Sequence, residues 1–217
     1  LNVFWVEYYH EIRMYSMQIM FIMMMIWHYY FLGQSNRASR WYHWFGLIFS
    51  ATASLYTQPF SFFVHVAIGL YHVLFAPKKY RWLKITLAFV LVGLLYLPWL
   101  PTTYTGLTTK FDTSTDPMLF QTAVQVFVRL LSNGMPLLML GLVVLAVMQL
   151  RHRAHRRQML FAWIMAGLIV VLLLITNETI GLIPMRRARY FFVAWGMWSV
   201  VMGIGLAYIR YQWLAVG

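Results

Sequence analysis

The sequence predicts an all-α membrane protein, a polytopic bundle of about seven transmembrane helices. Hydrophobic residues make up 62% of the 217 residues and charged residues only 10%, whereas about a quarter of the residues in soluble domains are charged. The mean hydropathy is +0.67, and apolar stretches recur along the whole chain. This excess of apolar surface requires lipid around it. One transmembrane domain covering residues 1–217 is the natural unit.

The expected spans are apolar stretches of about 15 to 20 residues whose ends carry aromatic or basic side chains that reach the membrane interface. Only Gln58, Pro59 and Phe60 separate the second span from the third. These two are therefore either tilted helices or a re-entrant pair. The spans run from Met14 to Leu32, Trp41 to Thr57, Ser61 to Ala76, Ile85 to Leu100, Met135 to Leu150, Met159 to Ile175, and Phe191 to Ile209.

A long polar stretch follows the fourth span. It reads TTYTGLTTKFDTSTDP after Pro101 and is expected to form an external loop. The next segment, Met118 to Ser132, has helical periodicity with apolar residues on most faces. We expect this segment to lie in the outer membrane interface as one external interfacial helix. Its polar face consists of Gln121, Gln125, Arg129 and Ser132.

The distribution of charge predicts the orientation. Loops that alternate along the chain divide into a set without acids and a set that holds all five acidic residues. By the positive-inside rule the set without acids is cytoplasmic, which places the N-terminus outside and the C-terminus inside. The cytoplasmic set is Arg37, Arg40, Lys78, Lys79, Arg81, Lys84, Arg151, Arg153, Arg156, Arg157 and Arg210. The external set is Arg13, Lys110, Arg129, Arg186, Arg187 and Arg189, with Glu7, Glu11, Asp112, Asp116 and Glu178.

Composition also excludes several functions. The chain has no cysteine, so disulfides, thiolate metal sites, paired-cysteine redox chemistry and covalent haem attachment are ruled out. The net charge of +12 would suggest nucleic acid for a soluble protein, but these cations lie mostly in short loops between apolar stretches. We therefore expect the lipid bilayer, and not nucleic acid, as the main partner.

The densest polar cluster precedes the first span. Glu7, His10 and Glu11 share one face of a helix, and Arg13 follows them. Carboxylates and an imidazole here could position a cation or a phosphate at the external surface, with Arg13 as the phosphate partner. The alternative is an ordinary polar helix end at the membrane surface.

A second cluster, Met185 to Tyr190, places three arginines outside the membrane. This departs from the positive-inside bias. External arginines suit the phosphate or diphosphate head group of a lipid, and the alternative is anchoring to anionic lipid. The candidates for binding lipid phosphate are Arg13, Arg187, Arg189 and Tyr190, supported by Glu7, His10 and Glu11.

Three histidines fall within the expected spans: His28, His65 and His72. Two of them, His65 and His72, lie seven residues apart on one face of the third span, but one helix cannot hold a single ring from both sides. We expect interior hydrogen bonding or placement at the membrane interface, in place of haem or chlorin ligation. No metal site is assigned, although a need for a divalent metal stays open.

Four segments in order resemble the dolichyl-phosphate-mannose protein mannosyltransferase-like family, which are membrane glycosyltransferases of the GT-C class. The first is EIRMY at Glu11 to Tyr15, and a basic loop follows it. Then come LYTQPF at Leu55 to Phe60 and LYLPWLP at Leu95 to Pro101. Arg189 and Tyr190 open the last span. The similarity covers nearly the whole chain.

The resemblance implies a sugar donor carried on a polyprenyl phosphate. Its phosphate would lie near the external arginines, with Glu11, Arg13, Arg189 and Tyr190 at the matching positions. The family commonly has Thr-His-Tyr where this chain has Thr57, Gln58 and Pro59, which puts the role of that histidine in doubt. The family's catalytic acid lies in the first external loop, which no segment here matches, so we expect an N-terminal portion that carries it. The catalytic residue itself is unknown.

Two other functions remain open. A non-catalytic subunit of a larger energy-transducing or photosynthetic membrane complex would keep the helical frame and have other membrane subunits as partners. A transporter or flippase for the lipid carrier is the third hypothesis, although we find no inverted repeat. In each case the expected location is the bacterial plasma membrane.

Overall fold

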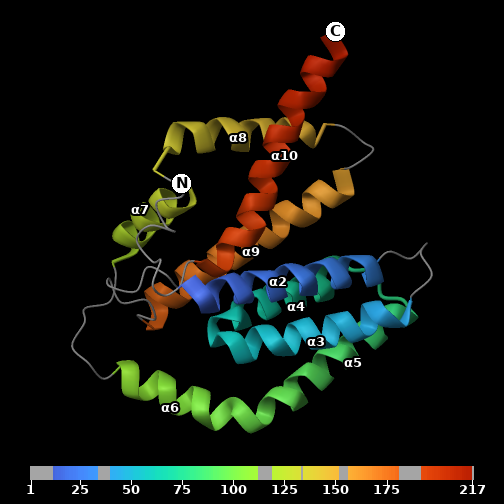
Figure 1. The fold of residues 1–217 in the computed structure, drawn as a ribbon, viewed down its shortest axis with the longest axis vertical. Helices are drawn as coiled ribbons and strands as arrows, with labels where there is room; N and C mark the ends of the chain where they lie inside the picture. Colours follow the sequence, from blue (N-terminus) through green and yellow to red (C-terminus); the bar gives the residue numbers. More distant parts are fainter. Residues whose placement is uncertain are drawn as a thin grey trace. The chain divides into compact units, whose positions relative to one another are not determined.

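The computed structural model describes residues 12–111 without 34–39, and residues 119–216 without 133, 152–155 and 181–191 (Figure 1). All regular structure in these residues is helical, so the all-α prediction is confirmed for them. The helices belong to two compact units, α2 to α6 and α7 to α10. The prediction of a single domain stays a prediction.

The first unit begins with four helices that match the first four expected spans. Helices α2 and α3 pack along each other and α3 also packs on α5 (Figure 1). A short 3-10 turn, η2, joins α3 to α4, and a second one, η3, joins α5 to α6. The bounds are α2 Ile12–Gly33, α3 Trp41–Thr57, η2 Pro59–Ser61, α4 Phe62–Phe75, α5 Tyr80–Tyr96, η3 Leu97–Trp99 and α6 Leu100–Phe111.

The interior of this unit is apolar and closely packed. Ile22 and Met25 of α2, Leu47 of α3 and Ile68 of α4 are almost completely buried. By contrast, α5 buries only Ile85, Ala88 and Val92, which lie one turn apart on a single face. Its other faces carry exposed apolar side chains, a surface suited to lipid contact. These exposed side chains are Leu83, Leu87, Val90, Leu91, Leu94 and Leu95.

The expected loop after Pro101 is the clearest difference from the sequence prediction. The structure continues as helix α6 through this polar stretch as far as Phe111. Pro101 lies in the first turn, where its missing N–H breaks no helical hydrogen bond. The hydroxyl of Thr103 donates to Trp99 O at 3.2 Å, and that of Thr105 donates to Pro101 O at 2.9 Å. Threonine side chains satisfied in this way are compatible with a helix despite their polarity.

In the second unit, α10 packs against α8 and α9, and α7 contacts α9. Helix α7 is amphipathic as expected: Ala123 and Phe127 are buried, whereas Gln125 and Arg129 are exposed. Its placement in the membrane interface stays a prediction. The chain bends by 78° between α7 and α8, and Gly134 adopts a φ of 76° at this bend. The bounds are α7 Phe120–Leu131, α8 Pro136–Gln149, α9 Arg156–Ile180 and α10 Phe192–Val216.

Within the described residues, two helical stretches are long and apolar enough to cross a membrane, Tyr80–Thr105 and Arg156–Thr179. The bent pair of α7 and α8 would be a third, either as a broken span or as a re-entrant loop. Shorter apolar helices occur at Pro59–Phe75 and Val193–Ala207. The chain therefore has the helices of a membrane protein. The number of seven spans and the orientation stay predictions.

Candidate functional site

The residues predicted to bind lipid phosphate lie largely outside the described part of the chain. Arg13 belongs to the first turn of α2, but its side chain is not among those described. The prediction of a phosphate site therefore stays untested by geometry. The other six, all outside the described residues, are Glu7, His10, Glu11, Arg187, Arg189 and Tyr190.

Two of the segments that carry the family resemblance, LYTQPF and LYLPWLP, meet at one end of the first unit, close to the beginning of α2. We call this end, formed by residues 12–18, 56–61 and 95–99, the motif end. The Nε2 of Gln18 in α2 donates to Ser61 Oγ in η2 at 3.1 Å, and Gln18 is fully buried. The hydroxyl of Tyr56 in α3 donates to Leu95 O in α5 at 2.9 Å. Segments about 40 residues apart in the chain are thus joined directly.

Aromatic rings pack at the motif end. The ring of Tyr56 meets Tyr96 edge to face at 5.6 Å and lies 5.6 Å from the ring of Trp99. The hydroxyl of Tyr96 is 2.6 Å from Thr103 Oγ1. Tyr56 and Trp99 are each 41% exposed, so each ring has an apolar face toward its neighbours and a free edge. Such amphipathic rings are typical of the interface between membrane and water.

All three histidines of the expected spans make hydrogen bonds. His28 Nδ1 lies 3.0 Å from His43 Nδ1, and His65 bridges α4 to α3 through contacts of its two ring nitrogens with Ser61 O at 2.9 Å and Ala51 O at 3.2 Å. These contacts fit the expected interior hydrogen bonding. Whether any of the three binds a haem or chlorin stays a prediction. Among the described residues, no cluster of three or more metal-ligating side chains occurs.

His72 ties three helices of the first unit together. Its Nε2 lies 3.1 Å from Trp82 O and 3.2 Å from Thr86 Oγ1. A carbonyl oxygen can only accept, so Nε2 carries the proton and donates to Trp82 O. Nδ1 is then the acceptor for the Tyr29 hydroxyl at 3.2 Å. The imidazole also stacks on the Trp82 ring at 5.0 Å, and Trp82 Nε1 donates back to His72 O at 2.9 Å.

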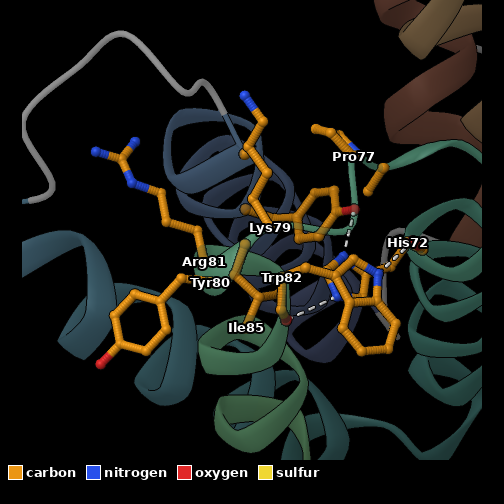
Figure 2. Close-up of a pocket in the computed structure, with 10 residues that line it drawn as sticks. His72, Pro77, Lys79, Tyr80, Arg81, Trp82 and Ile85 are labelled. Carbon is orange, nitrogen blue, oxygen red and sulfur yellow. Dashed lines mark hydrogen bonds between the residues drawn. The ribbon is translucent and has the colours of Figure 1, made fainter.

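A pocket lies beside this network (Figure 2). Its lining residues come from the end of α2, the end of α4 and the beginning of α5, which are opposite the motif end. Its volume is about 300 Å³, at the lower end of the range of about 300–1,000 Å³ found for small-molecule sites. Tyr29, His72 and Trp82 form part of its wall, and Lys79 and Arg81 line it as well. Sequence reasoning treated the two cations only as markers of topology. Lysines and an arginine at the beginning of α5 are a signal that could have located the pocket.

Comparisons with known proteins identified no relative of this chain. Neither the models of protein families, nor the curated proteins, nor the solved structures gave a match to this chain. The family resemblance therefore rests on the short segments quoted above and stays a prediction.

Proposed function

We propose that this chain is a membrane glycosyltransferase-like protein that uses a polyprenyl-phosphate-linked sugar donor at its external face. One observation carries the proposal: two segments that resemble the mannosyltransferase-like family, LYTQPF and LYLPWLP, are joined at the motif end by the hydrogen bond from the Tyr56 hydroxyl to Leu95 O. A membrane enzyme needs its site residues at one end of its helices, because its polar substrates approach from one side of the membrane.

The proposed orientation follows from the distribution of charge. Under the predicted topology the motif end faces outward, and the basic residues Arg40, Lys78 and Lys79 lie at the opposite, cytoplasmic end. The threonine-rich helix α6, which begins beside the motif end, supplies hydroxyl groups at the outer surface. A polar outer rim above apolar helices suits a substrate with a long lipid chain and a sugar head.

In this proposal the chain's own residues bind the donor. Arg13, Arg187 and Arg189 would hold the donor phosphate through charge-assisted hydrogen bonds, and Tyr190 would add a hydroxyl donor. Glu7, His10 and Glu11 would orient these groups or the acceptor. The transfer itself also needs a carboxylate that takes a proton from the acceptor or holds a metal. The family's acid has no counterpart among these residues, so none is assigned that role.

The test is binding of a polyprenyl-phosphate-linked sugar by the full-length protein in lipid nanodiscs, measured with radiolabelled donor. Arg13→Gln and Arg189→Gln are each expected to weaken binding about tenfold, because each removes one charge-assisted contact with the phosphate. The matched control is Arg129→Gln. It removes an arginine of the same predicted face from the exposed surface of α7 and is expected to leave binding unchanged.

Two results would contradict the proposal. An equal loss in all three variants would mean that only the net external charge matters. Failure of the wild-type protein to bind the donor, together with co-purification of other membrane proteins in fixed stoichiometry, would favour a non-catalytic subunit of a larger complex.

A further inference from the structure

We propose that the pocket beside His72 binds the phosphate head group of an anionic phospholipid, at the end of the first unit opposite the motif end. The pocket opens between the last turn of α2, the end of α4 and the beginning of α5. It thus lies at the opposite end of α2 from Arg13. The inference does not depend on glycosyl transfer.

The pocket combines apolar walls with cations. Tyr29, Trp82 and Ile85 provide apolar surface, while Lys79 and Arg81 extend away from the stacked rings of His72 and Trp82 (Figure 2). A ligand that fills this space therefore meets apolar side chains on one side and positive charge on the other. Amphipathic anions have this pattern.

Charge complementarity identifies the head group as anionic. Residues 12–111 contain no aspartate or glutamate, so this part of the chain supplies no carboxylate to balance the pocket's cations. Lys78 and Lys84 flank the pocket and raise the positive potential further. The Nζ of Lys84 lies 4.5 Å from the centre of the Tyr80 ring, on the outward side of α5. Clusters of four or more basic residues close to an apolar helix are typical of sites for anionic lipid head groups.

The start of α5 reinforces this conclusion. Lys79 is the N-cap, its side chain makes no capping hydrogen bond, and the first turn has no acidic residue. Basic residues at a helix N-terminus oppose the helix dipole. A bound phosphate would reverse this penalty, since it can interact with both the cations and the helix N-terminus.

A lipid, as opposed to a soluble phosphate compound, follows from the surface next to the pocket. The outward side chains Leu83 and Leu87 are 51% and 57% exposed, and they continue along the candidate span that begins at Tyr80. An acyl chain could therefore lie along α5 while its head group enters the pocket. Under the predicted topology this end faces the cytoplasmic leaflet, where positively charged loops meet anionic lipid.

The test uses the full-length protein in detergent with phosphatidylglycerol and phosphatidylcholine of identical acyl chains, and native mass spectrometry to measure bound lipid. The wild type is expected to retain phosphatidylglycerol in preference to phosphatidylcholine. The double variant Lys79→Gln/Arg81→Gln is expected to weaken phosphatidylglycerol binding about 30-fold, because each basic residue near an anionic head group contributes roughly a factor of five.

Two further variants distinguish lipid binding in the pocket from non-specific attraction of lipid to positive surface charge. Arg156→Gln/Arg157→Gln removes two exposed cations of the same predicted cytoplasmic set, which belong to the second unit and do not line the pocket, and it is expected to keep the preference. Gly33→Leu should abolish binding by filling the pocket, because Gly33 lines it and a Cβ there meets no atom within 4 Å. Its control is Gly93→Leu, which is equally unhindered but lies in the exposed part of α5.

Three outcomes would overturn the inference. Equal binding of the two lipids would exclude recognition of an anionic head group. An equal loss in both double variants would mean non-specific attraction. Displacement of the lipid by glycerol phosphate at equal concentration would mean that a soluble phosphate compound is the ligand.

Discussion

Replacement of His72 by phenylalanine is expected to lower the free energy of unfolding by about 3 kcal/mol, because buried polar groups lose hydrogen bonds. The phenyl ring can keep the stacking on Trp82, so the loss comes from hydrogen bonding. Tyr29, only 2% exposed, loses the hydrogen bond from its hydroxyl to His72 Nδ1. Trp82 O keeps Thr86 Oγ1 as a donor but loses the hydrogen bond from His72 that links α4 to α5. Unfolding in mixed micelles, followed by far-ultraviolet circular dichroism, measures the change.

The control for this prediction is Tyr29→Phe, which removes only the hydroxyl. It is expected to cost about 1 kcal/mol. In the double variant Tyr29→Phe/His72→Phe the hydroxyl that loses this hydrogen bond is absent, so the combined cost should be smaller than the sum of the two single costs. Strict additivity would show that the 3.2 Å contact between Tyr29 and His72 contributes nothing to stability, and the proposed network would then be wrong.

Several helices could be predicted closely because residues next to their ends determine where they begin and end. The expected span Trp41 to Thr57 coincides with α3, since aromatic residues open it and Gln58 and Pro59 end it. The prediction of a loop after Pro101 is wrong for residues 102–111, which are helical. The threonines of this stretch give it a polar composition, and composition alone does not show that their hydroxyls can bond to carbonyls one turn back within a helix.

The sites were less predictable because they depend on contacts between distant segments. The sequence indicated that His65 and His72 take part in interior hydrogen bonds, but nothing local shows that the partner of His72 is Tyr29, 43 residues earlier. The same holds for Tyr56 and Leu95 at the motif end. The basic residues of the cytoplasmic set are interpreted only as topology, because the positive-inside rule accounts for them. Only the fold shows that Lys79 and Arg81 line a pocket.

The close approach of α8 and α10 in the second unit predicts a large loss of stability when Gly205 is replaced. A Cβ on Gly205 of α10 would overlap the carbonyl oxygen of Leu142 in α8, so these helices can pack only because the residue has no side chain. Small residues at helix contacts allow such approaches in membrane proteins. Gly205→Ala is therefore expected to lower the free energy of unfolding by about 3 kcal/mol, since the backbone of α8 must move to relieve the overlap.

The matched control for Gly205→Ala is two residues away. Gly203 is exposed on the same helix, and a Cβ there meets no atom within 4 Å. Gly203→Ala is expected to be neutral or to stabilise the protein by up to about 1 kcal/mol, because alanine has the higher helix propensity. Equal effects of the two substitutions on the unfolding midpoint would contradict the close packing of α8 on α10. A loss confined to Gly205 would show that this contact, and not helix propensity, limits the stability of the second unit.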